Sequence, residues 1–181
     1  MELYEKTLSS ESIFEGRVIH VTLDQIELPN GHRSSREVVG HPGGVCIAAL
    51  NNKNELYFVK QYRYPYHEVV LELPAGKLEK GSTPLENGIR ELKEEVGAIG
   101  KDYVFLGELY PSPGYCAEII YLYFCRIDSL GDDCPDEDEF LDVIPINIDK
   151  AVEMVLKNEI KDSKTQTAVL KTAFLLKNGV L

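Results

Sequence analysis

Three glutamates, Glu91, Glu94 and Glu95, lie within five residues of one another in this chain. On a helix they occupy positions i, i+3 and i+4, so their carboxylates project from one side and repel one another. Like charges at this spacing destabilise a helix, whereas a bound divalent cation reverses the sign of the interaction. The spacing alone leaves two interpretations open, of which a divalent metal site is one. The alternative is a solvated acidic helix face whose charge is offset by Arg90 and Lys93.

The helix that carries these glutamates has clear boundary signals. Thr83 is a good N-cap, Pro84 suits the first helical position, and Glu86 completes a capping box with Thr83. Gly97 is a typical C-terminal glycine. An apolar stripe with spacings of four, three and four residues is expected to face the core, about 130° from the carboxylates. The stripe consists of Leu85, Ile89, Leu92 and Val96.

Strand patterns dominate the first half of the chain, and helices are spread between later strands. The first two predicted strands, residues 17–28 and 34–40, are expected to form an antiparallel hairpin or meander. This arrangement predicts an α+β or three-layer αβα domain and argues against a regularly alternating parallel fold. Extended segments are predicted at 17–28, 34–40, 41–50, 55–64, 67–76, 103–110, 118–127 and 141–148, and further helices at 148–158 and 163–177.

Composition narrows the function classes. The chain has 181 residues, 44% of them hydrophobic, and a formal net charge of −11, with no basic run, so nucleic-acid binding is disfavoured. An anionic small molecule would also be repelled unless a divalent cation were bound. No signal peptide or segment of membrane-spanning length is visible, which predicts a cytoplasmic protein with no membrane partner. The four cysteines and four histidines lack zinc-ligand spacing.

Residues 76–98 resemble the signature of the Nudix hydrolases, Gx5Ex7REUxEExGU, in which U is aliphatic. Gly76 opens the motif, residues 90–92 match REU, residues 94–95 match the glutamate pair, and Gly97 is the final glycine. Ser82 stands where the signature has a glutamate, and Ala98 is small where a larger aliphatic residue is usual. The resemblance implies that Ser82 weakens the bracing of Arg90, with Glu79 or Glu86 as substitutes, and leaves metal binding intact.

Beyond this motif, the chain resembles the ADP-ribose pyrophosphatase subfamily along most of its length. Segments 27–45, 59–65, 72–81, 110–124 and 136–140 carry the resemblance. Pro113 looks like a substrate marker of the subfamily, and its alternative is an ordinary Ser-Pro-Gly turn. The implied fold is a Nudix αβα sandwich with a mixed central sheet, preceded by a small N-terminal antiparallel β subdomain. We expect the subdomain at 1–40 and the hydrolase domain at 41–181.

The resemblance implies Mg²⁺-dependent hydrolysis of ADP-ribose to AMP and ribose 5-phosphate. The metal ligands would be Glu91, Glu94, Glu95 and the carbonyl oxygen of Ala75, and Mn²⁺ would be a substitute cation. A carboxylate would deprotonate the attacking water. Because this base tends to come from a loop after the motif, Glu137 is the first candidate and Glu139 the second, with Glu94 as a further catalytic residue. The alternative is that the acidic loop is only solvated.

The resemblance also assigns residues to substrate recognition. Arg63 offers a planar donor fork for a phosphate or ribose. Arg36 and Glu37 match residues that approach the substrate from the N-terminal strands, often those of a partner subunit, and a homodimer is expected by analogy. Glu72 would accept a hydrogen bond from adenine or ribose. Surface ion pairing is the alternative for the arginines and Glu37, and pairing with a lysine for Glu72.

Three tyrosines at alternate positions are expected to share one strand face, where one would stack on adenine. Edge-strand packing explains them equally well. They are Tyr62, Tyr64 and Tyr66.

Two other functions remain open at this point. The first is a Nudix pyrophosphatase with a different substrate, such as a nucleotide sugar or a dinucleotide. The second is a Nudix-like domain that senses a nucleotide without cleaving it, which only Ser82 favours.

Overall fold

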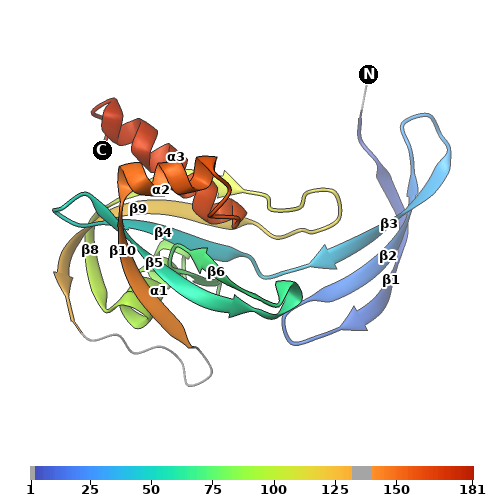
Figure 1. Ribbon diagram of the computed structural model, residues 1–181. Coiled ribbons are helices and arrows are strands. Elements are labelled where there is room, and N and C mark those ends of the chain that lie inside the picture. The colour runs from blue at the N-terminus through green and yellow to red at the C-terminus, as the bar shows by residue number, and fades with distance from the viewer. Residues whose placement is uncertain (1–2, 132–139) are drawn as a thin grey trace. The chain divides into compact units, whose positions relative to one another are not determined.

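The computed structural model describes residues 3–131 and 140–181 (Figure 1). Its contacts divide the chain into two compact units. Unit 1 takes the chain up to Gly43 together with Tyr110–Ile119, and unit 2 takes Gly44–Leu109 and Ile120–Leu181.

Unit 1 is built on a three-stranded antiparallel sheet in the order β1-β2-β3, with bounds Lys6–Glu15, His20–Glu27 and Arg33–Gly40. The predicted hairpin is confirmed, since β2 and β3 pair without interruption from His20↔Gly40 to Glu27↔Arg33. Strand β1 was not predicted. Its sequence is rich in serine and glutamate and all ten of its residues are exposed, so it lacks the buried alternation that identifies a strand.

Unit 2 contains a mixed seven-stranded sheet with the main order β10-β5-β4-β9-β8. Strands β4 and β9 run parallel, whereas the other pairs are antiparallel, including β6 with β5 and β7 with β4. The strands are β4 (Gly44–Leu50), β5 (Glu55–Arg63), β6 (Glu68–Glu72), β7 (Ala75–Lys77), β8 (Ala98–Leu109), β9 (Ile120–Leu130) and β10 (Leu141–Asn147).

Helices cover both faces of this sheet (Figure 1). Strand β4 is buried along its whole length because its alternate side chains enter two separate cores. Cys46, Ala48 and Leu50 share one core with α2 (Ile148–Leu156) and α3 (Ser163–Lys177). Val45, Ile47 and Ala49 share the other with α1 (Pro84–Val96). The predicted three-layer αβα fold is therefore confirmed.

Helix α1 begins and ends as predicted, with Thr83 as N-cap, a complete capping box and Gly97 in the left-handed conformation. Its predicted buried face is wrong in part. Ile89 is 42% exposed, whereas Glu91 and Glu95 are buried. The reason is Gly88, where a Cβ atom would lie 2.6 Å from Ile47 Cδ1. This close approach to β4 turns the carboxylate side of the helix toward the sheet.

Two smaller differences concern local geometry. Strand β8 begins directly after the helix, at Ala98, and not at residue 103, because it continues through a register shift that includes Asp102 in the left-handed region. The three tyrosines do not share a strand face, since β5 ends at Arg63 and Tyr64–Tyr66 forms a 3₁₀ turn.

Among the described residues, none of the helices has the length and apolarity needed to span a membrane.

Candidate active site

The loop between β7 and α1 is fastened to the helix by one buried side chain. Asn87 accepts a hydrogen bond from the Glu79 amide at 3.1 Å and donates one to the Thr83 carbonyl at 2.8 Å. Because Asn87 is almost fully buried, both bonds are protected from water. Strand β7 pairs with the central strand β4 at Cys46↔Ala75. The loop therefore joins two rigid elements in a defined geometry.

The buried carboxylates of α1 lie against β7. The Ala75 amide donates to Glu95 Oε2 at 3.2 Å. A Cβ atom at Gly76 would lie 1.9 Å from Glu91 Oε1, so the absence of a side chain there creates the space that the Glu91 carboxylate fills. The structure thus brings Ala75, Glu91 and Glu95 together. It also argues against the solvated acidic face, because Glu91 and Glu95 are 8% and 3% exposed.

Arg90 connects Glu94 to this group. Its Nη1 donates to Glu94 Oε2 at 2.5 Å, and its Nη2 donates to Glu91 Oε1 at 2.6 Å and lies 3.3 Å from Glu79 Oε1. Partial burial by itself lowers the pKa of Arg90, but the charges of Glu91, Glu94 and Glu79 outweigh it and raise that pKa. Of the two predicted substitutes for the missing glutamate at Ser82, Glu79 contacts Arg90, whereas Glu86 is committed to Thr83.

The donor chemistry of this site fits a hard divalent cation. Across residues 3–131 and 140–181, no three His, Cys, Asp or Glu side chains are already gathered into a metal-binding cluster. Arg90 and the Ala75 amide instead hold the carboxylates of Glu91, Glu94 and Glu95. These carboxylates, with the neighbouring backbone carbonyl of Ala75, form the all-oxygen donor set that Mg²⁺ prefers. The residues present therefore fit this metal.

A second charged cluster lies on β5, β6 and α3. Arg63 donates from Nε and Nη2 to the two carboxylate oxygens of Glu72, at 2.5 and 2.7 Å. Lys164 contacts the same carboxylate and also lies 3.1 Å from Asp162. Two predicted recognition residues, Arg63 and Glu72, therefore bind each other, and Glu72 has the lysine partner that was its alternative. Sequence reasoning missed Lys164, whose only signal is that it follows the N-cap Asp162 of α3.

The charges in this cluster shift one another's titration. Burial by itself would raise the pKa of Glu72, but the hydrogen bond from Arg63 and the charge of Lys164 lower it. For Lys164, burial by itself would lower the pKa, but the negative charges of Asp162 and Glu72 outweigh burial, and the pKa is raised. The pKa of Arg63 is raised mainly by its hydrogen bond to Glu72, with a contribution from the charge of Glu95. Of the α1 carboxylates, Glu95 therefore acts on Arg63 through its charge.

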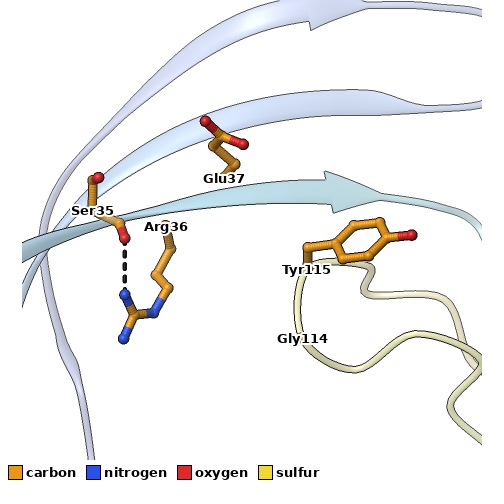
Figure 2. Close-up of a pocket in the computed structure, with 5 residues that line it drawn as sticks. All are labelled: Ser35, Arg36, Glu37, Gly114 and Tyr115. Atoms are coloured by element: carbon orange, nitrogen blue, oxygen red, sulfur yellow. Dashed lines mark hydrogen bonds between the residues drawn. The ribbon is translucent and has the colours of Figure 1, made fainter.

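The remaining predicted recognition residues belong to unit 1. A cavity of about 300 Å³ is lined by Ser35, Arg36, Glu37, Gly114 and Tyr115 (Figure 2). Pro113 precedes Gly114 in the same turn. Figure 2 shows Arg36 and Glu37 on opposite sides of β3, as consecutive strand residues must be. Arg36 binds the Glu5 carboxylate through Nε and Nη2, so the surface ion pair that was the alternative to substrate recognition is present. The two base candidates, Glu137 and Glu139, lie outside the described residues.

Comparison with known proteins assigns the family. The NUDIX domain model matches residues 40–167, and the model of the nucleoside diphosphate sugar hydrolase N-terminal domain matches residues 5–39. The chain belongs to the Nudix hydrolase family.

Two relatives and a solved structure are similar to this chain along most of its length. The chain is 44% identical over 167 residues to the methanol dehydrogenase activator of Bacillus methanolicus, covering 91% of this chain and 90% of the relative. It is 39% identical over 169 residues to the ADP-ribose pyrophosphatase of Bacillus subtilis, covering 92% and 91%. A crystal structure of an ADP compounds hydrolase matches with a TM-score of 0.86 at 21% identity, over 100% of both chains, which supports the fold.

Proposed function

We propose that this Nudix hydrolase cleaves the pyrophosphate bond of ADP-ribose to give AMP and ribose 5-phosphate. The observation that carries the proposal is the placement of the buried Glu91 and Glu95 carboxylates against Ala75 and Gly76. The substrate assignment is supported by the similarity to the B. subtilis ADP-ribose pyrophosphatase along more than nine tenths of the chain.

The metal ligands in this proposal are Glu91, Glu94, Glu95 and the Ala75 carbonyl. Bound Mg²⁺, or Mn²⁺ in its place, would offset the charge of the two phosphates and polarise the bond that breaks. The protein's own contribution is positional. Strand β7 fixes Ala75, the gap at Gly76 admits Glu91, and Arg90 holds Glu91 and Glu94 in a defined orientation.

A general base is needed to take a proton from the attacking water. We assign this role to Glu137 first and Glu139 second, with Glu94 as the further catalytic carboxylate on α1. Arg63, Glu72, Arg36, Glu37 and Pro113 are assigned to substrate recognition. Arg63 supplies the charge and planar donor geometry suited to a phosphate, and Arg36 and Glu37 border the cavity of unit 1.

The test is release of AMP from ADP-ribose by wild type and Glu95→Gln, with Mg²⁺ and with a chelator. The glutamine keeps an oxygen that can accept the Ala75 amide, but it removes the negative charge and replaces the other oxygen with an amide group that cannot bind a cation. We expect turnover to require the metal and kcat to fall by about 100-fold in the variant, with an unchanged melting temperature. Glu68→Gln removes an exposed carboxylate that pairs with Lys161, and it should retain full activity.

Two results would contradict the proposal. Equal activity of wild type and Glu95→Gln would show that Glu95 is not a ligand of the catalytic metal. Binding of ADP-ribose and other diphosphates without any cleavage would show that the protein senses a nucleotide and does not hydrolyse it.

A second candidate function has its own observation, the 44% identity to a protein described as a methanol dehydrogenase activator. In this reading the chain hydrolyses another nucleotide derivative, such as a dinucleotide or nucleotide sugar, and its action raises the activity of a dehydrogenase. A substrate panel and an alcohol dehydrogenase assay with added protein separate this reading from the first. Preferred cleavage of ADP-ribose with no effect on the dehydrogenase would favour the first proposal.

A further inference from the structure

The buried lysine of α3 is a charged side chain in unit 2 that the family signature does not explain. Lys164 is 8% exposed, and its ammonium group contacts the buried carboxylate of Glu72. Burying an ammonium group costs several kcal/mol before any partner is counted, and a well-packed apolar residue is often more stabilising at such a place. Stability alone is therefore a weak explanation for this lysine.

The charges around Glu72 suggest a more specific explanation. The Glu72 carboxylate accepts two hydrogen bonds from the Arg63 guanidinium and also contacts Lys164. One negative charge therefore pairs with two positive charges. Without Lys164, Glu72 would neutralise Arg63 by itself, and the guanidinium would present little net charge to a ligand. Arg63, Glu72 and Lys164 together carry one positive charge, and the sum becomes zero when Asp162, 3.1 Å from the ammonium, is included. Without Lys164, Arg63 and the two carboxylates would carry one negative charge. The second carboxylate oxygen of Asp162 accepts the Thr165 amide at the start of α3, which holds Asp162 in place beside the lysine.

The hydrogen bonds of Arg63 also determine which edge of its guanidinium can face an anion. The Nε and Nη2 donors of Arg63 are bound to Glu72, so an anion would meet the Nη1 edge of the guanidinium. The side chain of Arg63 is 40% exposed, whereas that of Glu72 is only 3% exposed. Arg63 can therefore contact a ligand in solvent. Glu72 and Lys164 are buried, so they affect the ligand only through Arg63.

We propose that Lys164 is a positioning residue, which offsets the charge of Glu72 and so keeps Arg63 available for a phosphate of the substrate. This inference rests on the proposed function. It assigns to Lys164 no contact with the substrate and no part in bond breaking. The effect of its removal should therefore appear in substrate affinity and depend on Arg63.

The experiment compares KM and kcat for ADP-ribose in wild type, Lys164→Met, Arg63→Gln and the double variant. We expect Lys164→Met to raise KM about tenfold with little change in kcat, and to have no further effect on KM when Arg63 is already glutamine. Lys164→Arg should restore part of the affinity because it returns the charge. Lys161→Met, which removes an exposed lysine paired with Glu68, should match wild type.

Other results would overturn the inference or require that it be tested by binding measurements. An unchanged KM in Lys164→Met, or equal effects of Lys164→Met in the presence and absence of Arg63, would overturn the inference and leave the proposed function standing. If wild type binds ADP-ribose without cleaving it, the proposed function fails, and the dissociation constants of the same four proteins test the inference by calorimetry. If wild type neither binds nor cleaves ADP-ribose, both are overturned. Melting temperatures identify a variant that has simply failed to fold.

Discussion

Gly76 shows how one missing side chain shapes the candidate site. The Glu91 carboxylate occupies the space in which a Cβ atom of residue 76 would lie, at 1.9 Å from Oε1. The conflict is with a flexible side chain, so a larger residue would displace Glu91 without unfolding the sheet. The position therefore matters for function more than for stability.

We predict that Gly76→Ala lowers kcat for pyrophosphate hydrolysis by about tenfold or more, because a shift of about 1 Å in a ligand group is enough to disturb catalysis. The free energy of unfolding should change by less than about 1 kcal/mol. Urea denaturation and AMP release measure the two quantities. Gly131→Ala is the matched control, since its nearest described neighbour would be an ordinary contact at 3.8 Å. Wild-type activity in Gly76→Ala would contradict the argument.

Glu72 leads to a prediction about acid stability. Burial opposes its ionisation, but the hydrogen bond from Arg63 and the charge of Lys164 hold its folded-state pKa below the ordinary 4.5. The carboxylate therefore stabilises the fold above about pH 4.5, and this contribution is lost as the pH falls through the lower folded-state value. We expect Glu72→Gln to flatten the decline in unfolding free energy in that pH range, whereas Glu68→Gln should follow wild type. Urea denaturation at a series of pH values would reveal parallel curves if the argument is wrong.

Helix α1 shows what a well-capped element contributes to a site. Its first turn is fixed by reciprocal bonds between Thr83 and Glu86, and the preceding loop is held by Asn87. These contacts set the start of the helix and hence the rotation of every carboxylate along it. The cap is thus part of the framework for Glu91 and Glu95.

We predict that Thr83→Ala lowers the free energy of unfolding by about 1 kcal/mol, the usual effect of losing an N-cap hydroxyl. Ser82→Ala, at the exposed neighbouring position, should leave stability unchanged. Urea denaturation of both variants provides the comparison. An equal loss in the two would show that the hydroxyl of Thr83 is not what stabilises this helix start.

The three-stranded sheet of unit 1 raises the question of whether two chains assemble. Three antiparallel strands are about the smallest sheet that is stable alone, and only when one face is covered. Here β1 is exposed throughout, with Leu8, Ile13 and Phe14 at 40%, 56% and 53% exposure. Exposed apolar side chains grouped on one strand are typical of an interface. This supports the homodimer expected from the family resemblance.

We predict that sedimentation equilibrium gives twice the chain mass of 20.4 kDa. Ile13→Glu should raise the dissociation constant of the dimer about 100-fold, because it places a charge in an apolar contact. Leu156→Glu changes a more exposed leucine on α2 and should leave the dimer intact. A monomeric wild-type protein at micromolar concentration would contradict the prediction.

The parts of this protein that the sequence determined by itself are those set by near neighbours. The start of α1 at Thr83, its end at Gly97 and the spacing of its glutamates depend on contacts within one or two helical turns, so local rules predict them. The alternation in β2, the apolar run of β4 and the β-branched and aromatic residues of β5 were equally readable. These local features were enough to predict the fold class and the carboxylate group on α1.

Only the tertiary structure decided which side of α1 is buried and which charges meet. The helix faces β4 with Gly88 because residue 47, far back in the chain, fills the space beneath it. Lys164 reaches Glu72 across 92 residues of sequence, and neither residue carries a local sign of the other. Such contacts arise from the packing of α3 and the sheet strands into one core, and the energies that select them are spread over the whole domain.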